Sequence, residues 1–496
     1  MADDVATFSK VAQFFLIISL TCRTFSPGLC HNDEDDMAFD TGSHARTVYL
    51  IYDVNPGEGF NLRRDVYLRM SILVKNLNKD EPWTLVVPPW NRLYHWQSRD
   101  IEQNSLPWSS FFEMESFNRH VPVIEFEEFN KSKFSNGVID ELYYLQHYKE
   151  GWGKDWEEKM HERPCIDRQY YKQDKSGRWH GYFWDYHKVY AKIFQCISIQ
   201  GHASFIIPFL QKNTTGRSVF INRAESLLHD TFGGKDYWEG RRSMRFAKHL
   251  REVGDKFRSD YLDSTDEKDN TVLDPDWRNM RRKHGDAKGG PYIGVHLRRA
   301  DFLRVRENEV PSIQGAAKTL KKLLKEYKLK KVFIATDGTR EELKKDLKDY
   351  EVFRYQPTES ELQQYKDGGV AIIDQWICAH ARYSIGSHES TFSFRIQDER
   401  EILGFLSKTS FNRFCPDDKN ECEQPAKWTI WLYSYLLRLL TMDIFWYIVR
   451  ILNQILPGSI VTMTPVSTRY MPFLLIFHDH GMHDIDDYKY SRYGLP

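Results

Sequence analysis

The sequence predicts an α/β fold with two Rossmann-like domains that face each other across a cleft. Short runs of β-branched and aromatic residues alternate with helical stretches, and this alternation occurs in two series, one on each side of residue 260. Strands that alternate with helices of this length form parallel sheets. With 496 residues, 41% of them hydrophobic, the chain is long enough to bury both cores.

The first domain, residues 46–260, opens with TVYLIYD at 47–53, which predicts a buried strand that ends at a glycine-rich loop. The stretch 143–194 is crowded with tryptophan, tyrosine and charge and shows no clear period, so we expect mixed loops and helices there. The other elements expected are a helix at 61–77, strands at 83–89 and 121–129, and a charged helix at 239–261.

The second domain, residues 261–428, contains near its start the polar, acidic stretch 264–270, which suits a boundary. The elements expected after it are a strand at 291–299, a helix at 312–329, a strand at 331–337 and a helix at 339–350. Ligands of open parallel sheets bind beyond the carboxyl ends of the strands. We therefore expect the chemistry in the loops after Asp53, His296 and Asp337.

The ends of the chain bear on the compartment. Residues 1–28 hold an apolar run followed by small and polar residues, which predicts a secretory signal peptide; a buried N-terminal helix is the alternative. The secretory route makes Asn130 and Asn213 candidates for N-glycosylation. Residues 429–496 form an apolar tail that charged residues interrupt before any run could span a membrane. An interfacial helix or translated non-coding sequence fits this tail, which is the only segment with a case for membrane association.

The charge balance and the cysteines narrow the class of protein. Lys and Arg number 69 against 70 Asp and Glu, so no net positive charge points to nucleic acid as a partner. In an oxidising compartment, cysteines that are near in the sequence pair most easily. The expected disulfides are Cys165 with Cys196 and Cys415 with Cys422, with Cys378 left as a buried thiol. A zinc site is the competing interpretation, but no CxxC doublet supports it.

The loop after the first strand carries the first candidate for catalysis. Glu58 stands between Gly57 and Gly59, where the strand hands over to a helix. Two glycines let the backbone approach a ligand closely, and the carboxylate between them can project into the gap. The alternative is an acidic residue in a solvated turn.

The second candidate follows the strand at 291–299. Alternation along a strand places His296 and Arg298 on the same face, where both can reach one ligand. Arginine offers planar, permanently charged donors that suit a diphosphate. Arg299 points the other way and is expected to form a structural ion pair.

The third candidate combines a helix that carries Asp374 with a serine- and threonine-rich helix start at 390–395. The carboxylate can bind guanine, and amide and hydroxyl donors at the helix start can bind phosphate. Ordinary helix capping by Ser390 and Thr391 is the alternative.

Together these motifs resemble the protein O-fucosyltransferase 2 family, whose members transfer fucose to thrombospondin type 1 repeats. The resemblance covers about residues 46–428 and is carried by residues 53–65, PPW at 88–90 with RLYHWQS at 92–98, GVHLRR at 294–299 and residues 367–382. It implies two Rossmann-like domains of the GT-B type, transfer with inversion at the anomeric carbon, and no metal or other cofactor.

The resemblance also implies roles for individual residues. Glu58 matches the general base, Arg298 the residue on the diphosphate, and Glu399 an acidic position needed for activity, which we interpret as a supporting residue. An inverting displacement needs such a base on the acceptor side and such a cation on the leaving group. The implied contacts to GDP-fucose are Gly57, Glu58, Gly59, Phe60, Asn61, His296, Leu297, Arg298, Asp374, Thr391 and Phe392, with Asp374 on guanine.

These expectations describe a peptide O-fucosyltransferase of the endoplasmic reticulum lumen that acts on folded thrombospondin type 1 repeats. Related enzymes that act on epidermal-growth-factor-like repeats place an asparagine where this chain has Glu58, so the carboxylate disfavours that acceptor. A different disulfide-rich module as acceptor is one alternative, and a non-catalytic binder or folding assistant of such repeats is another. Metal-dependent transferases hold an ion with an Asp-x-Asp pair, but Asp274-Pro275-Asp276 lies in a predicted linker, so no metal site is expected.

Overall fold

The structure is a computed structural model of the whole chain. It describes residues 46–133, 135–151, 156–166, 170–305, 309–338, 344–419 and 421–430, with the backbone of 460–462 and 476–478. The predicted signal peptide and nearly all of the predicted tail lie outside the described residues. Within the tail, β14 (Ile460–Thr462) pairs antiparallel with β15 (Ile476–His478). Every helix in the described ranges is too short or too polar to cross a bilayer.

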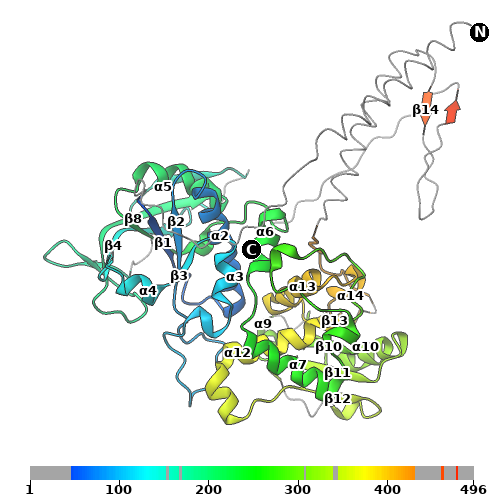
Figure 1. Cartoon of the computed structure of the whole chain (residues 1–496). Helices are drawn as coiled ribbons and strands as arrows, with labels where there is room; N and C mark the ends of the chain where they lie inside the picture. Colours follow the sequence, from blue (N-terminus) through cyan, green and yellow to red (C-terminus); the bar gives the residue numbers. More distant parts are fainter. Residues whose placement is uncertain are drawn as a thin grey trace, which may run out of the picture. The chain divides into compact units, whose positions relative to one another are not determined.

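The first sheet is mostly parallel and carries the predicted first domain (Figure 1). Its parallel strands lie in the order β3 (Val123–Glu125), β2 (Trp83–Val87), β1 (Val48–Tyr52), β9 (Ser218–Asn222), β4 (Val138–Gln146) and β8 (Tyr190–Gln200). Three short strands extend the β8 edge in antiparallel fashion: β5 (Lys159–Glu162), β7 (Trp179–His180) and β6 (Lys172–Gln173).

Alternation along β1 sends hydrophobic side chains to both faces of this sheet. Leu50 joins the core that includes α2 (Phe60–Leu77), whereas Ile51 packs on the other face with Phe126 and Trp184. Each fully buried side chain of this size contributes about 1.5 to 3 kcal/mol. The first sheet is therefore stabilised from both sides, and its strands present only their ends to a ligand.

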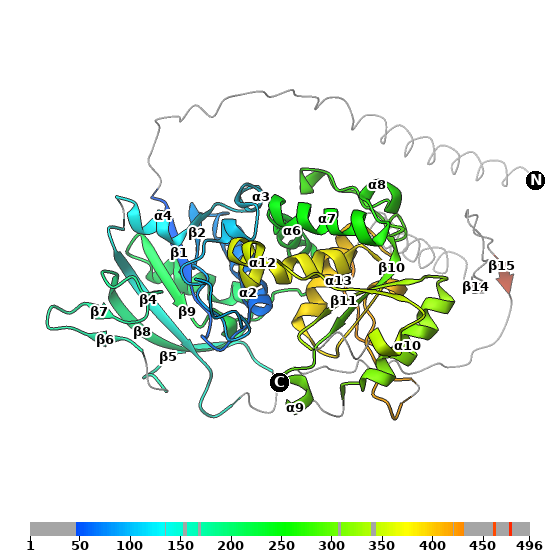
Figure 2. The same ribbon diagram turned by 90° about the horizontal axis from the view of Figure 1, so that it is seen from below.

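The second sheet is fully parallel, in the order β12 (Glu351–Phe353), β11 (Lys331–Thr336), β10 (Gly290–Leu297) and β13 (Ala381–Gly386). Ile293 of β10 packs in a core with Leu320 of α10 (Ile313–Glu326), and Tyr292 packs in the core on the other face. That other face is covered by α12 (Glu359–Ala379) and α7 (Lys248–Leu262), which lie side by side (Figure 2).

The predicted α/β class with two Rossmann-like halves is confirmed by these two sheets. The division at residue 260 stays a prediction. Helix α7, which the sequence assigns to the first domain, packs against α12 and β10, whereas α6 (Lys235–Ser243) packs against α2.

Three secondary-structure predictions are wrong. The helix expected at 239–261 is two helices, α6 and α7, because the chain turns at 244–247 and buries Met244 and Phe246 there. The strand expected at 121–129 ends at Glu125, where α4 (Phe126–Lys131) begins. The stretch 143–194 contains strands rather than helices, and its strand β4 is buried along most of its length, which removes the polar alternation.

Most of the remaining helices are short connections. The polar stretch 264–270 forms α8 (Asp266–Asp269), whose first turn is capped by the Thr265 hydroxyl. The others are α3 (Met114–Asn118), α5 (Ile207–Asn213), α9 (Phe302–Val305), α13 (Thr391–Leu403) and α14 (Ser407–Ser410), with 3-10 turns at Trp108–Ser110, Ala203–Ile206, Ala224–Ser226 and Trp277–Asn279. Part of the helix expected at 339–350 lies outside the described residues.

The structure contains both disulfides that the sequence favours. Cys165 pairs with Cys196 of β8, Cys415 pairs with Cys422, and Cys378 on α12 is a buried thiol. The first bridge closes a loop between residues 31 apart and stabilises the fold by roughly 3 to 4 kcal/mol on a chain-entropy estimate.

A buried ion network joins α6 to α13. Asp398 accepts from Arg241 Nε at 3.0 Å and pairs with Arg395 Nε at 3.2 Å, and neither Asp398 nor Arg241 has an exposed side chain. The Tyr237 hydroxyl and the Trp428 indole also donate to this carboxylate, at 2.9 and 2.8 Å. This set of donors around the Asp398 carboxylate is what allows its charge to remain in the interior.

Replacing Asp398 with alanine should lower the free energy of unfolding by about 3 kcal/mol or more, because it leaves buried guanidinium groups without their shared carboxylate. Urea denaturation measures the change. The matched control is Asp260→Ala, which removes an exposed partner of Lys256 and should leave the unfolding midpoint unchanged. Equal effects of the two substitutions would show that the buried network does not stabilise the fold.

Candidate active site

Both sheets bring loops together where the order of their strands reverses. In the first sheet the chain places β2 and β3 on one side of β1 and β9 on the other. In the second sheet it places β11 and β12 on one side of β10 and β13 on the other. Crevices at such points bind ligands beyond the carboxyl ends of the strands. Glu58 follows β1 and Arg298 follows β10, so both predicted motifs lie at these points.

Arg63, in the first turn of α2, fixes the loop that carries Glu58. Its Nε donates to the carbonyl of Glu58 at 3.1 Å, and its Nη2 donates to the carbonyl of Asn55 at 3.1 Å. Its Nη1 donates to the buried carboxylate of Asp53 at 3.2 Å. Because the loop is tied from inside through its backbone, the side chain of Glu58 stays half-buried and unconstrained by these bonds.

The electrostatics around Glu58 suit a proton acceptor. Burial raises the pKa of Glu58, and the charge of Glu225 raises it further, while Arg63 and Arg223 oppose the rise. A base works best when its pKa lies nearer to the working pH than that of an ordinary carboxylate. The alternative of a merely solvated turn residue does not account for this half-buried position.

At the end of β10, His296 and Arg298 do lie at one site. His296 is 6% exposed, stacks on the Phe392 ring at 4.3 Å and bonds through Nδ1 to the Ser393 hydroxyl at 2.8 Å. Burial lowers the pKa of His296 to about 3, so the ring is neutral. The direction of the Nδ1 bond depends on the tautomer, and the tautomer that accepts from the Ser393 hydroxyl carries its proton on Nε2, where it can donate to an anionic ligand.

Arg298 is held in place from both ends. Its backbone N–H donates to the Ser387 hydroxyl at 2.8 Å, and its Nε donates to Asp301 at 2.8 Å. Its guanidinium lies 4.4 Å from the centre of the Phe302 ring. The side chain of Arg299 donates to the carbonyl of Pro311 at 2.8 Å, and its expected ion pair stays a prediction.

The start of α13 fits an anion better than it fits ordinary capping. Ser390 occupies the N-cap position and is fully buried, yet its hydroxyl makes no capping bond and has no partner among the described residues. Thr391 and Phe392 form the first turn beside it and are partly buried. Free donors at a helix N-terminus attract negative charge.

Asp374 of α12 carries a second buried polar atom without a partner in the described residues. Its Oδ1 is inaccessible and accepts no hydrogen bond. Burial raises the pKa of Asp374 to about 8, and the nearby Arg354 opposes the rise only in part. A polar atom left unpaired in this way is the arrangement expected where a ligand supplies the missing donor.

A three-residue bridge joins the two predicted motifs. Arg64 Nη1 donates to Gln375 at 2.8 Å, and Gln375 Nε2 donates to Asn61 at 2.9 Å. Asn61 is the second residue of α2, three residues after Glu58, and Gln375 follows Asp374 on α12. The base loop and the candidate guanine site are therefore held together by direct hydrogen bonds.

The other predicted residues divide into backbone and supporting positions. The side chains of Phe60 and Leu297 are buried in the cores, so only their backbones are available to a ligand. Glu399 is buried and accepts from Arg241 at 2.6 Å, so it belongs to the ion network between α6 and α13.

Four residues near the site were not singled out from the sequence. Arg223 and Glu225 follow β9, and the Asn55 backbone donates to Glu225 at 3.1 Å. Tyr94 and His95 lie beside Gly59, where an added methyl group would fall 2.7 Å from His95 Cδ2. The RLYHWQS stretch at 92–98 was a signal for the second pair, but nothing in the sequence marks the first.

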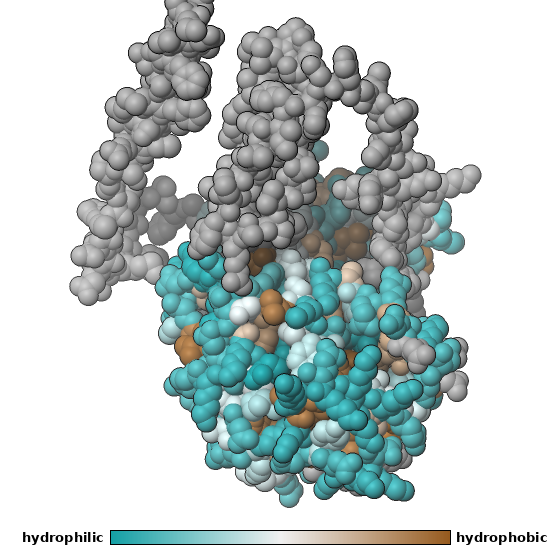
Figure 3. All heavy atoms as spheres, turned by 90° about the vertical axis from the view of Figure 1, so that its right-hand side faces the viewer, coloured by the Kyte–Doolittle hydropathy of each residue, from teal (hydrophilic) through white to brown (hydrophobic). Residues whose placement is uncertain are grey.

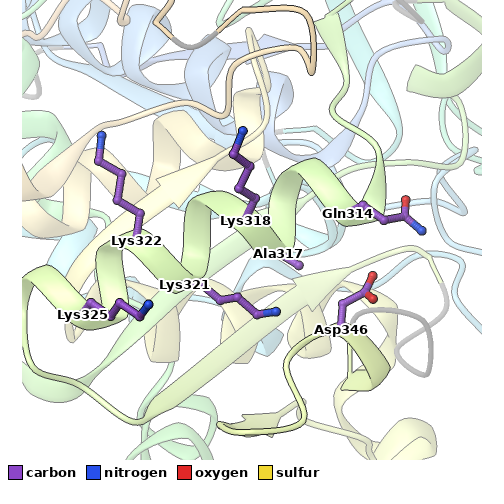
Figure 4. A pocket seen from close by; sticks show the side chains of 7 residues that line it. All are labelled: Gln314, Ala317, Lys318, Lys321, Lys322, Lys325 and Asp346. Atoms are coloured by element: carbon purple, nitrogen blue, oxygen red, sulfur yellow. The ribbon is translucent and has the colours of Figure 1, made fainter.

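A hollow on α10 lies on the face of the second sheet opposite to α12 (Figure 4). Its lining is basic and includes none of the predicted site residues: Gln314, Ala317, Lys318, Lys321, Lys322, Lys325 and Asp346. The side of the molecule shown in Figure 3 is largely hydrophilic, with hydrophobic groups only in scattered places. We therefore place the candidate active site at the strand ends and not in this hollow.

Comparison with known proteins decides the family. The family model for GDP-fucose protein O-fucosyltransferase matches residues 49–403, which contain every predicted donor contact. The chain belongs to the GDP-fucose protein O-fucosyltransferase family. This fucosyltransferase is a peptide O-fucosyltransferase that uses GDP-fucose as its donor.

Its relatives agree over most of their length. The fucosyltransferase is 55% identical over 394 residues to GDP-fucose protein O-fucosyltransferase 2 of Homo sapiens, covering 79% of this chain and 91% of that one. It is 46% identical over 396 residues to the Caenorhabditis elegans protein of that name, covering 78% and 91%. Among solved structures, POFUT1 in complex with GDP superposes with a TM-score of 0.49 at 16% identity, over 76% of this chain and 100% of that one.

Asp374→Asn should change how the stability of the fucosyltransferase depends on pH. The carboxyl has a pKa of about 8 when folded and 3.8 in its ordinary state, so folding takes up a proton and stability falls as pH rises between these values. The amide does not titrate. The free energy of unfolding of the Asp374→Asn variant minus that of the wild type should therefore rise with pH between these values, by at most about 1.4 kcal/mol per pH unit. Urea denaturation near the two ends of this range measures it, and a constant difference would show that Asp374 is ionised when folded.

Proposed function

We propose that the enzyme transfers fucose from GDP-fucose, with inversion, to a serine or threonine of folded thrombospondin type 1 repeats in the endoplasmic reticulum lumen. The observation that carries the proposal is the half-buried carboxylate of Glu58, fixed at the strand-order reversal of the first sheet. Its raised pKa suits a general base. An inverting transfer requires one such base on the acceptor side of the sugar.

In the proposed reaction Glu58 takes the proton of the acceptor hydroxyl. The freed oxygen attacks the anomeric carbon of fucose, and the bond from that carbon to the diphosphate breaks on the opposite face. GDP leaves with the electron pair, and its growing negative charge is stabilised by Arg298. Asp301 and Phe302 hold the Arg298 guanidinium in place, so little reorganisation is needed as charge develops.

The remaining contacts follow from the unpaired polar groups. Guanine presents N–H donors on its base-pairing edge, and the free Oδ1 of Asp374 can accept them. The Ser390 hydroxyl and the backbone of Thr391 and Phe392 then face the phosphates. In this proposal Glu399 does not contact the substrate but orients Arg241 within the buried network.

Two kinds of feature support the proposed acceptor and the proposed compartment. A carboxylate at position 58, where enzymes acting on epidermal-growth-factor-like repeats are expected to have asparagine, supports a thrombospondin repeat as the acceptor. Two disulfides in the structure support an oxidising compartment, as the endoplasmic reticulum provides. The N-glycosylation of Asn130 and Asn213 stays a prediction; Asn213 is exposed and Asn130 is partly exposed.

The decisive assay is fucose transfer from GDP-fucose to a folded thrombospondin type 1 repeat. We expect transfer to this repeat and none to the reduced repeat or to a folded epidermal-growth-factor-like repeat. Glu58→Gln keeps the size of the side chain but removes the base, and should lower kcat at least ~100-fold. GDP binding, measured by calorimetry, should stay within about threefold of wild type, because the residue acts on the acceptor.

Each other outcome of this assay has a definite meaning. Donor binding without transfer would favour a different acceptor or a non-catalytic binder of the repeats. A Glu58→Gln enzyme with wild-type kcat would show that another residue is the base.

Glu225→Gln should move the pH profile of transfer toward lower pH. The negative charge of Glu225 raises the pKa of Glu58, so the neutral amide lowers it, and the base stays deprotonated to a more acidic pH. The acid limb of kcat/KM therefore shifts down, while the amide oxygen can still accept from the Asn55 backbone. Glu252→Gln, on the exposed surface of α7, is the control and should leave the limb in place. If the acid limb does not move in Glu225→Gln, the protonation of Glu58 does not set the pH profile of transfer.

A further inference from the structure

Residues 90–106, which we call the strap, form a closed loop between β2 and α3. Trp90 and Leu106 close its base through two backbone hydrogen bonds of 2.8 Å each. The strap contains the RLYHWQS stretch at 92–98, to which the proposed reaction assigns no role. Loops of this kind, with ends that meet, are compact units that often serve function.

The strap is anchored to the second half of the protein through Asp367 of α12. The Asp367 carboxylate accepts from the Ser98 backbone at 3.0 Å, from the Ser98 hydroxyl at 2.6 Å and from Gln103 Nε2 at 3.1 Å. Its own N–H donates to Gln103 Oε1 at 3.0 Å. Helix α12 is broken just before this point, at Lys366 with a φ of 59°, which turns the Asp367 backbone toward the strap.

Packing next to Asp367 leaves no freedom for the strap. A methyl group on Gly368 would fall 2.9 Å from Trp96 of the strap and 2.8 Å from Phe111. Trp96 is 4% exposed and lies 5.9 Å from Phe60, ring centre to ring centre. Glycine is thus required where the strap meets α12, and Trp96 connects that contact to the first residue of α2.

The tip of the strap lies between the base loop and the diphosphate arginine. The rings of Tyr94 and His95 are 3.6 Å apart, and His95 covers Gly59 of the base loop. Tyr94 is 56% exposed and lies near Arg298, where it acts with Asp301 to raise the pKa of that guanidinium. The charge of Arg298 also helps burial to lower the pKa of His95, to about 4, so the imidazole is neutral beside the site.

An exposed aromatic tip on a rigidly anchored loop calls for a reason beyond packing. Four hydrogen bonds involving Asp367 fix the strap, while the Tyr94 ring at its tip remains more than half exposed. Ordering such side chains costs conformational entropy that their own contacts return only in part. A rigid strap is useful if it positions the reacting groups, because a misplacement of 1 Å can lower the rate about 100-fold.

We propose that the strap is a positioning device for transfer: Asp367 fixes its tip, where Tyr94 orients Arg298 and His95 sets the place of the Glu58 loop. The inference rests on the proposed function, since it assigns the strap to the distance between base and leaving group. Neither tip residue takes part in bond making. Together they determine how well Glu58 and Arg298 are aligned on opposite sides of the anomeric carbon.

The test compares transfer kinetics with GDP binding in single variants. Tyr94→Phe and His95→Ala should each lower kcat about tenfold or more, with the Kd for GDP within about threefold of wild type. Arg99→Ala, on the exposed surface of the same strap, is the control and should match wild type in both. Wild-type kcat in both tip variants would overturn the inference, and so would a loss of GDP affinity as large as the loss of kcat.

A second measurement separates positioning from general destabilisation. Asp367→Asn keeps the shape of the anchor but cannot accept all three bonds, so kcat should fall about as far as in the tip variants. Combined with His95→Ala, it should add less than threefold further loss, because both act through one tip. If the kcat losses of the two single variants multiply fully in the double variant, Asp367 and His95 act independently and the inference is wrong. Failure of the wild-type enzyme to modify any folded repeat would instead defeat the proposed function, whatever the variants do.

Discussion

Asp398 keeps a negative charge in the interior of the protein, and the donors that surround it come from separate parts of the chain. Arg241 and Tyr237 belong to α6, Arg395 belongs to α13 with Asp398 itself, and Trp428 follows the last described helix. A charge that is expensive to bury becomes tolerable only when all of these donors are in place at once. The donors therefore surround Asp398 only when α6 packs on α13 in the observed arrangement.

That arrangement carries the active site with it. Arg395 also pairs with Asp65 of α2 at 3.7 Å, so the helix that begins at the base loop is tied to the helix that begins at the candidate phosphate site. The Arg64–Gln375–Asn61 bridge ties α2 to α12 as well. Since the reacting groups come from two different sheets, their separation depends on such ties rather than on either sheet alone.

Much of this could be predicted from the sequence, and the failures have physical causes. The strands β1, β10 and β11 are rich in β-branched and aromatic residues, and their observed ends lie within two residues of the expected ones. The strands β4 and β8 were missed because burial of one and the exposed edge of the other remove the alternation that marks a strand. The helix pair α6 and α7 was merged because the buried turn between them is itself apolar.

The site residues divide in the same way. Glu58, His296 and Arg298 stand in local motifs, at strand ends where topology alone predicts a ligand. Glu225 and Arg223 act on Glu58 only because β9 pairs with β1, a pairing that joins residues about 170 positions apart and that no local pattern announces. Asp367 was part of a recognised motif, yet its role as an anchor depends on a loop far earlier in the chain.

The charged groups of the candidate site come from both halves of the protein. The first half supplies a carboxylate whose pKa burial raises, and the second supplies a guanidinium beside a neutral imidazole. Each group also has charged neighbours in its own half, since Arg63 and Arg223 oppose the rise in the pKa of Glu58 and Asp301 pairs with Arg298. In the proposed reaction the developing positive charge on the sugar would face the carboxylate of Glu58 while the departing phosphate faces Arg298, which is the order that an inverting transfer requires.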